Sequence, residues 1–589
     1  MSYKVKRVTL IPLLFLHVQA WEVEPATKDK LTAYKYVEEG QQLAQEAIPL
    51  DSNTYQQWNS LEAMLNQLPS VCAISSFYGG NTSLFVRGAN SNHNAVFLNK
   101  RSFPSGFAND FNFSHFPIFD SDSVLLKTDI QSPIGGTLEI TTGPASFNEV
   151  GIEGGSFGFH REHVNFSKTT PTSQFHLWLS ETQTQNVDPH NAYKGRSFWA
   201  HWRRIKDAYT YELLSYGYYE QIELPGPRVS GFPRLADYQD RQTYLISPGL
   251  QISAEKRYRL FAHYAFSLDS MDSLASNNLV QNETFNHEAF AAFKWKGQTL
   301  ATSTSLRALS QCLQQSQPTS FDTTWNSLHA QQSCTWKGDL LQIKANTGAF
   351  RHSQFSSDWS CGLRAEVTLG SWTPFASFAR SIHYPTPNDF LYSQSHSLKT
   401  EKAYRSQMGI KIALNDTLQL SLCGFYNVLF DLIECDPFPP YDTYNVAKAN
   451  IYGLESSLVL KKEALNAYLN CTYWHAYAKD GLGVYQNGNR LLRRPKYKLT
   501  TGAQYAFTRA LSAGIDLSFR KDIIDIDPST YQRISGDDTL TLRIYTTYFI
   551  TPELLLSAHV ENLLNDKYQE IRGYNSLPLQ AYVGIKYRF

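Results

Sequence analysis

The short run Gly154-Gly155-Ser156-Phe157-Gly158 fits the Gly-x-Ser-x-Gly pattern that presents a nucleophilic serine in one class of hydrolases. In those enzymes the serine lies on a turn between a strand and a helix, yet here the strand pattern continues on both sides of Ser156. We therefore interpret these glycines as positions where a strand bends. The sequence shows neither a phosphate-binding loop nor a zinc-protease helix, and we expect no enzymatic activity.

Histidines and cysteines are the next residues that could support chemistry. His160 and His163 flank a predicted tight turn and could bind a metal ion together, although two separate surface histidines are the commoner arrangement. The seven cysteines match no zinc spacing, and their odd number leaves at least one thiol without a partner in the chain. Two pairs either close loops as disulfides or remain isolated thiols: Cys312 with Cys334, and Cys423 with Cys435.

The overall composition limits the classes of protein that fit. The 589 residues carry no net formal charge, so nothing indicates binding to nucleic acid. Mean hydropathy is -0.36, which excludes a chain made mostly of membrane-spanning helices. One apolar run, Val8–Val18, follows a basic start and leads into Val18-Gln19-Ala20, the pattern of a signal-peptide cleavage site. We expect residues 1–20 to be a signal peptide and the mature chain to lie outside the cytoplasm.

The elements that would position these residues are strands with one apolar and one polar face. In the last nine residues the apolar face consists of alternate positions, namely Ala581, Val583, Ile585, Tyr587 and Phe589. The same alternation occurs in residues 258–268, 540–548 and 554–561. The predicted strands are roughly 9–13 residues long, which suits tilted strands that cross a bilayer.

The connections between these strands alternate in length. Turns such as Lys296-Gly297 alternate with longer polar segments such as Asp269–Thr284, Ser310–Trp325 and Tyr384–Ala403. Outer-membrane barrels show this alternation, because their periplasmic ends are tight turns and their outer ends are loops. The sequence therefore predicts a membrane all-β fold, an antiparallel transmembrane β-barrel of about 22 strands over residues 146–589. The chain can end at Phe589 because the last strand of a closed barrel pairs with the first.

The residues before the barrel lack this strand-and-turn pattern. They combine a helical stretch, Leu61–Leu68, with strands at Leu84–Val86, Ala95–Leu98 and Gly135–Thr142. A barrel of about 22 strands has a wide lumen, and such barrels are plugged rather than open. We expect residues 51–145 to form an α/β plug domain in the lumen, preceded by a periplasmic N-terminal segment, residues 21–50.

Several stretches resemble the TonB-dependent receptors of bacterial outer membranes. In the plug they are LEAMLNQLPSV (61–71), SLFVRGANSNHNAVFLN (83–99) and IGGTLEITTG (134–143). In the barrel they include IYGLESSL (451–458), RRPKYKL (493–499) and ENLLNDKYQEIRGY…YVGIKYRF (561–589). Within the family the plug is most similar to that of the cobalamin transporters, and siderophore receptors share many of these motifs. The resemblance covers nearly the whole mature chain. It implies an outer-membrane receptor that imports a large scarce solute, cobalamin or an iron–siderophore complex.

The resemblance also implies site residues. Aromatic rings and amides at the plug apex would bind a large flat ligand with polar edges. These residues are Phe77, Tyr78, Asn81, Asn92, His93, Phe107, Asn109 and Phe111. Arg87 would pair with Glu455 of the barrel, since a buried charge needs a partner, unless Arg87 is a solvated residue at a strand end. Calcium in outer loops would use Asp188, Asp237 and Asp240, although calcium usually takes six or more oxygens. No other cofactor is expected.

A receptor of this family would draw energy from a TonB-type periplasmic protein that pulls on the N-terminal segment. The best candidates for the coupling residues are Leu31, Thr32, Ala33, Tyr34, Lys35, Tyr36 and Val37. The further expected partners are the small-molecule ligand, outer-membrane lipid, and the barrel assembly machinery, which would bind the strand that ends at Phe589.

The plug departs from the family in two places. VLLKTDIQSPIGG (124–136) is shorter and lacks the family's Arg-Gly-Pro and Tyr-Gly, and residues 97–100 (FLNK) replace its Ile-Asp-Gly-Val. These changes leave a second function open, that of an adhesin or surface antigen that no longer imports. The N-terminal region of roughly 120 residues argues against a third, that of a passive porin.

Overall fold

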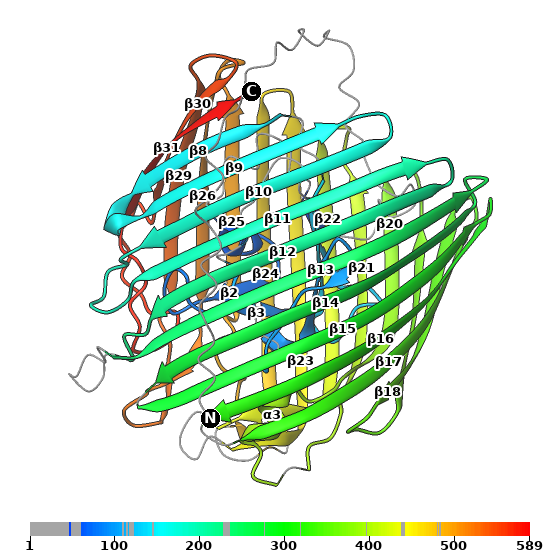
Figure 1. Ribbon diagram of the computed structural model, residues 1–589, viewed down its shortest axis with the longest axis horizontal. Helices are drawn as coiled ribbons and strands as arrows, with labels where there is room; N and C mark the ends of the chain where they lie inside the picture. The colour runs from blue at the N-terminus through cyan, green and yellow to red at the C-terminus, as the bar shows by residue number, and fades with distance from the viewer. Residues whose placement is uncertain are drawn as a thin grey trace, which may run out of the picture. The chain divides into compact units, whose positions relative to one another are not determined.

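Strands with alternating side chains build a closed barrel of 22 antiparallel strands in this computed structural model (Figure 1). The structure describes residues 46–48, 60–108, 111–113, 116, 123–143, 147–227, 236–275, 277–317, 320–395, 397–436, 442–479, 481 and 485–589. The first half of the barrel comprises β8 (Glu149–Gly155), β9 (His160–Thr169), β10 (Ser173–Thr184), β11 (Tyr193–Lys206), β12 (Tyr209–Glu223), β13 (Tyr238–Ala254), β14 (Tyr258–Ala275), β15 (Asn278–Lys296), β16 (Leu300–Gln317), β17 (Phe321–Lys337) and β18 (Leu341–His352). The second half comprises β19 (Asp358–Val367), β20 (Trp372–His383), β21 (Glu401–Ala413), β22 (Leu418–Cys435), β23 (Thr443–Lys462), β24 (Leu465–Lys479), β25 (Tyr497–Ala506), β26 (Leu511–Lys521), β29 (Thr539–Phe549), β30 (Leu554–Glu561) and β31 (Gln580–Arg588). The predicted number of strands is confirmed.

The barrel closes where the last strand meets the first. β31 pairs antiparallel with β8, in a register that places Tyr587 opposite Val150. Beyond this pairing, the Phe589 N–H donates to the Asn148 carbonyl at 3.0 Å, and the Asn148 N–H donates to the Phe589 carbonyl at 3.3 Å. The chain therefore ends within the hydrogen-bonded sheet, as the alternation of its last residues predicts.

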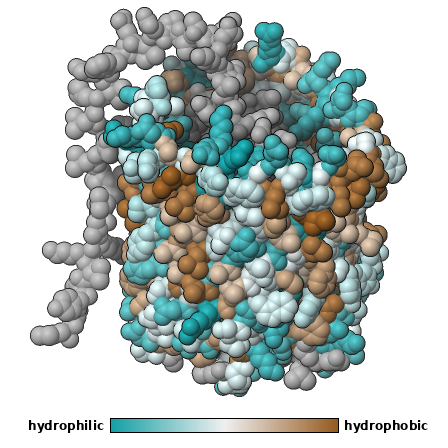
Figure 2. All heavy atoms as spheres, turned by 90° about the vertical axis from the view of Figure 1, so that its right-hand side faces the viewer, coloured by the Kyte–Doolittle hydropathy of each residue, from teal (hydrophilic) through white to brown (hydrophobic). Residues whose placement is uncertain are grey.

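The strand faces also follow the predicted alternation. Along β14, Tyr258, Leu260 and Tyr264 are exposed on the outside, whereas His263 and Asp269 are buried on the inside. Figure 2 shows hydrophobic side chains spread over the barrel wall and hydrophilic ones gathered at its upper rim. No helix in the described part of the chain is long and apolar enough to cross a membrane.

The plug is a small α/β unit. Its main sheet has the order β1 (Glu46–Ile48), β6 (Ser123–Lys127), β7 (Gly136–Thr141), β4 (Asn94–Leu98) and β5 (Arg101–Ser102). A second sheet pairs β2 (Val71–Ile74) with β3 (Ser83–Val86), and a 3-10 turn, η1, covers Ser91–His93. The helix α2 (Leu61–Leu65) starts at the N-cap Ser60, whose side chain accepts from the Ala63 N–H. It ends at Leu65, three residues earlier than predicted, and the side chain of the next residue, Asn66, bonds both the carbonyl and the N–H of Ala73 on β2.

The plug lies in the lumen and packs against two parts of the barrel wall. Plug side chains such as Leu61, Val86 and Phe116 form one hydrophobic cluster with Trp178 and Tyr216 of the barrel. We call this cluster the β10–β14 seam. A second cluster joins plug residues to barrel residues on β21–β24, and we call it the β21–β24 seam; it includes Cys72, Ile74, Phe85, Ile134, Phe425, Ile451 and Trp474. Plug and barrel therefore share these two large hydrophobic cores and two smaller clusters, around Phe77 and Phe107, which the sequence pattern of the strands does not reveal.

Some predicted outer loops are strands instead. β14 and β15 are joined by residues 276–277, and β16 and β17 by residues 318–320, so the polar segments predicted as loops extend the strands. These four strands have 17 to 19 residues. Because about 9–11 residues cross a bilayer, both hairpins extend well beyond it.

Of the two alternatives for the cysteines, isolated thiols are confirmed, because all seven cysteines are free. Cys312 and Cys334 lie on the neighbouring strands β16 and β17, but Cys312 faces Thr324 and Cys334 faces Thr302. Cys423 and Cys435 lie on the same strand, β22. A disulfide needs Cα atoms within about 7 Å, which neither arrangement provides.

Candidate functional site

The motif around Ser156 does not form a catalytic site. Ser156 begins a 3-10 turn, η3 (Ser156–Gly158), and its hydroxyl accepts from the Ala581 N–H at 3.0 Å on the last barrel strand. His160 bonds Glu162 through Nε2 at 2.8 Å, whereas the Nε2 of His163 lies 3.0 Å from Glu149. Since alternate residues of a strand face opposite sides, His160 and His163 are directed apart and do not share a metal ion.

The eight predicted ligand residues at the plug apex have unequal exposure. Phe77, His93, Phe107 and Phe111 are buried, Tyr78 and Asn92 are partly buried, and Asn81 is exposed. Asn109 lies outside the described residues. The Tyr78 hydroxyl accepts from Arg161 at 2.7 Å, and its ring packs edge-on against Phe159 and Tyr193. Most of the eight predicted ligand residues are therefore packed within the plug apex rather than exposed at its surface.

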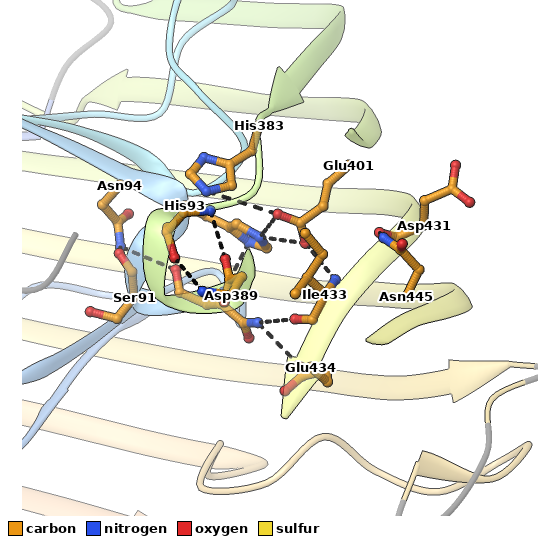
Figure 3. A network of polar contacts seen from close by, with 12 residues as sticks. Ser91, His93, Asn94, His383, Asp389, Glu401, Asp431, Ile433, Glu434 and Asn445 are labelled. Atoms are coloured by element: carbon orange, nitrogen blue, oxygen red, sulfur yellow. Dashed lines mark hydrogen bonds and ion pairs between the residues drawn. The ribbon is translucent and has the colours of Figure 1, made fainter. Parts of the chain in front are cut away.

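His93 is the most enclosed of these residues and belongs to a polar network (Figure 3). Its Nε2 lies 3.0 Å from both carboxylate oxygens of Glu401, at the start of β21, and neither side chain has exposed surface. The Asn90 N–H donates to the His93 Nδ1 at 3.1 Å, and the Ile433 N–H donates to Glu401 at 2.7 Å. Burial lowers the pKa of His93 to about 4, so its ring is neutral and donates to Glu401. This contact joins the plug apex to three strands of the wall, because His383 of β20 also packs against His93.

A cluster of rings from the outer connections and β17 packs against the plug segment that follows β5 and contains Phe107. Phe107 packs with Phe321 and Trp325 of β17, and the Asn388 N–H of α3 (Pro387–Tyr392) donates to the Phe107 carbonyl at 3.0 Å. The Trp325 ring lies 5.4 to 6.0 Å from the rings of His352, Phe355 and Phe390. We call this set the outer aromatic cluster: Phe107, Phe321, Trp325, His352, Phe355, Tyr384 and Phe390.

The sequence identified one member of this cluster, Phe107. The others lie in segments whose pattern is that of polar outer connections, and their aromatic residues are separated by up to 69 positions, from Phe321 to Phe390. Their aromatic content was the available signal, because exposed loops rarely hold so many rings without a packing or binding role. Only the barrel closure brings them to one place.

Ion pairs hold the plug to the wall. Arg87 donates through Nε and Nη2 to the two carboxylate oxygens of Glu455 at 2.8 and 2.7 Å, and through Nη1 to Gln407 at 2.6 Å. The structure thus brings the predicted pair together in a bidentate contact. It adds contacts that sequence reasoning missed: Arg101 with Glu212, the Ser75 N–H with Glu570, and Lys498 with the Leu68 carbonyl.

The remaining predictions have no geometry to support a site. Asp188 and Asp237 are buried and Asp240 lies on β13, but the described residues include no group of three or more His, Cys, Asp or Glu side chains that could hold a metal. Calcium binding there stays a prediction. The coupling segment, Leu31–Val37, lies outside the described residues.

The fold and these contacts define a class of protein, an outer-membrane barrel whose lumen is filled by an α/β plug. Residues 81–563 match the family described as "TonB dependent receptor-like, beta-barrel". The chain belongs to this family and to the bacterial outer membrane.

Individual relatives agree with this assignment. The chain is 23% identical to the "Vitamin B12 transporter BtuB" of Photobacterium profundum, over 90% of each chain. Its fold is similar to the ferric citrate transporter FecA, with a TM-score of 0.78, 15% identity, and 93% and 97% of the two chains covered. It is also similar to the siderophore receptor PirA of Acinetobacter baumannii, with a TM-score of 0.74, 14% identity, and 93% and 98% covered.

Proposed function

We propose that this receptor binds a large solute, a corrinoid or a ferric siderophore, at its outer aromatic cluster and imports it into the periplasm. The observation that carries the proposal is the cluster itself, in which a ring of the plug meets rings of β17 and of the connections that follow β18 and β20. Flat conjugated ligands stack on such rings, and amides nearby bind their polar edges. The full-length similarity to a vitamin B12 transporter favours the corrinoid.

The energy for import would come from a TonB-type protein acting on residues 21–50. The chain shows no phosphate-binding loop, so nucleotide hydrolysis within it is not part of this proposal. The plug is joined to the barrel by charged contacts such as Arg87–Glu455, which break and reform more readily than a covalent link. We propose no enzymatic step.

The experiment compares binding and uptake. Purified protein is titrated with cyanocobalamin, ferric citrate and a ferric catecholate while tryptophan fluorescence is recorded. Cells that depend on each compound are then grown with the full chain and with a chain that lacks residues 21–40. Binding of one compound, with growth that is lost on truncation, supports coupled import. Binding without growth would point to a different role.

The second candidate function is an adhesin or surface antigen. It is favoured by the β14–β15 and β16–β17 hairpins, whose strands extend well past the length that spans a bilayer. It predicts that none of the three compounds binds and that cells expressing the chain adhere to a host surface through these hairpins. Shortening both hairpins would then abolish adhesion.

A further inference from the structure

Three lysines lie side by side on four neighbouring strands of the barrel wall. Lys402 of β21 is opposite Phe430 of β22, and Phe430 is opposite Lys448 of β23. Lys448 is in turn opposite Lys479 of β24. Neighbouring strands are about 4.8 Å apart, so the three lysines form a line about 14 Å long across the strands. We call Lys402, Lys448 and Lys479 the lysine row.

The lysine row faces the outside of the barrel. Alternate residues of a strand face opposite sides, and the residues beside the three lysines, Glu401, Ala449 and Ala478, have no exposed surface. Phe430, which lies within the row, is 37% exposed on the outer side. The side chains of the row therefore project away from the lumen and from the plug.

The lysine row lies where the outer leaflet of the membrane meets water. Lys402 is the second residue of β21, which has 13 residues, whereas about 9–11 residues cross a bilayer. The connection before β21 is one of the long outer ones, residues 384–400. The next two rows of outward-facing residues, toward the periplasm, include four tyrosines, namely Tyr404, Tyr426, Tyr452 and Tyr477. Tyrosine rings gather at this level of a membrane, next to the lipid headgroups.

The lysine row carries three positive charges without a neutralising carboxylate among the residues that the structure describes. Lys448 lies over the Phe430 ring, with 5.2 Å between its Nζ and the ring centroid. Asp431 follows Phe430 in the chain, but it forms no ion pair with the row. Since like charges at this spacing repel one another, an anion that bridges the lysines would be stabilised by all three.

Several other cations near the outer ends of strands are paired. Lys194 and Arg196 of β11 both contact Glu181 of β10, at 3.2 and 2.6 Å. Arg380 of β20 pairs with Asp358 at 2.7 Å. At these strand ends a carboxylate of the chain supplies the counter-charge, whereas at the lysine row an anion from outside the described residues would supply it.

We propose that the lysine row binds the headgroup of an outer-leaflet lipid that carries two or more phosphates, the chemistry of lipid A. Lys448 and Lys479 are on adjacent strands and reach one phosphate together, whereas Lys402 is about 10 Å from Lys448 and needs a second phosphate. The acyl chains lie along exposed apolar side chains lower on the same face, such as Met408 and Leu454. The site is on the outside of the barrel, so it depends neither on the plug nor on the proposed function.

The first test compares two lipids and a variant. Native mass spectrometry measures how much of the purified full chain, in detergent, carries lipid A with two phosphates or lipid A with one. We expect the parent to bind the diphosphorylated lipid about tenfold more tightly, because only that lipid neutralises the whole row. The triple variant Lys402→Gln, Lys448→Gln and Lys479→Gln should lose this preference. Equal affinity of the parent for the two lipids, or an unchanged preference in the triple variant, would overturn the proposal.

The matched control removes three exposed lysines from the periplasmic end of the barrel, namely Lys256, Lys461 and Lys462. Their replacement by glutamine changes the net charge equally and should leave the preference intact, and its loss here would show that net charge alone attracts the lipid. Inorganic pyrophosphate is then added at the concentration of the lipid. It should displace no lipid, because it has no acyl chains to bury against the wall. Displacement would assign the row to a soluble anion and refute the lipid site.

The second test uses the parent chain alone and so does not depend on how a variant folds. Lysines are acylated in detergent micelles with and without diphosphorylated lipid A, and peptide mass spectrometry gives the rate at each lysine. Bound phosphate should slow acylation of the lysine row about fivefold and leave Lys461 and Lys462 unchanged. Unchanged rates along the row, or the same slowing at Lys461 and Lys462, would refute the site.

Discussion

At the scale of single residues, the charged contacts between plug and barrel are unequal. Arg87 and Glu455 are both largely buried and make a bidentate contact, and Arg87 also packs over the Phe425 ring at 5.0 Å. Removing one member of a buried pair leaves the other charge without its partner, which costs far more than losing an exposed pair.

We expect Glu455→Gln to destabilise the plug by about 3–5 kcal/mol. The measurement is urea-induced exposure of the plug thiol Cys72, which is buried in the native protein. Arg196→Gln is the control, because Arg196 pairs with Glu181 at an exposed position and its loss should cost less than about 1 kcal/mol. Equal midpoints for the two variants would contradict the proposed anchoring.

A second residue makes plug stability depend on pH. Burial, with the nearby charge of Glu570, raises the pKa of Glu62 in α2 to about 7 from a usual value of 4.5. The folded plug therefore holds a proton that the unfolded chain has released, so stability falls as pH rises from 4.5 to 7, by at most about 3 kcal/mol. Glu62→Gln should remove this loss, so its urea midpoint should exceed that of the parent at pH 8 but not at pH 4.

The control for this pH experiment is Glu139→Gln on β7, whose carboxylate pairs with Lys127. This variant retains Glu62 and should keep the pH dependence of the parent. A Glu62→Gln plug that loses stability between pH 4 and pH 8 as strongly as the parent would show that other groups dominate.

At the scale of elements, the period-two alternation predicted the barrel strands well. Tyr258 and Leu260 face outward and His263 faces inward on β14 because each side of the wall meets a different solvent. The positions where the strands end on the outer side of the barrel could not be predicted from this alternation. Asp269 is polar and suggested a loop, yet it is buried on the strand and bonded to Arg241 on the neighbouring β13. A polar residue in a polar lumen has the same sequence pattern as a polar residue in a loop.

The outer aromatic cluster yields a prediction at this scale. Trp325→Ala should reduce affinity for the ligand at least tenfold, because it removes the ring at the centre of the cluster. Trp336→Ala is the matched control, since Trp336 lies on the same strand but is exposed on the outside of the barrel. Equilibrium binding of cyanocobalamin and of ferric chelates gives the comparison. Equal affinities for the two variants would remove the cluster from the binding site.

At the scale of the whole molecule, the site depends on closure of the barrel. Arg87 and Glu455 are 368 positions apart, and His93 and Glu401 are 308 positions apart. The resemblance of motifs suggested the first pair, whereas no local pattern indicated the second. A pairing of this kind depends on which barrel strands surround the plug and on the register of those strands. No short stretch of the sequence contains that information.

Closure itself can be tested at the C-terminus. Deleting Phe589 removes two main-chain hydrogen bonds to Asn148 and should lower the yield of folded barrel several-fold, because the final strand closes the sheet. The measurement is the fraction that resists unfolding in cold detergent and migrates as a compact band on a gel. Tyr587→Phe is the control, as it retains the main chain and an outward-facing ring. A normal yield without Phe589 would show that β31 closes the barrel without its last residue.

The two large hydrophobic cores that plug and barrel share determine how the barrel would conduct ions if the plug were removed. Trp178, Trp199 and Trp474 have almost no exposed surface while the plug is present, and each lies in one of the seams. Without the plug these indoles would line the pore. A pore lined by hydrophobic side chains loses water and therefore conducts ions poorly. Excising the plug from this chain should therefore produce a channel whose ionic conductance is lower than expected for a pore of its diameter.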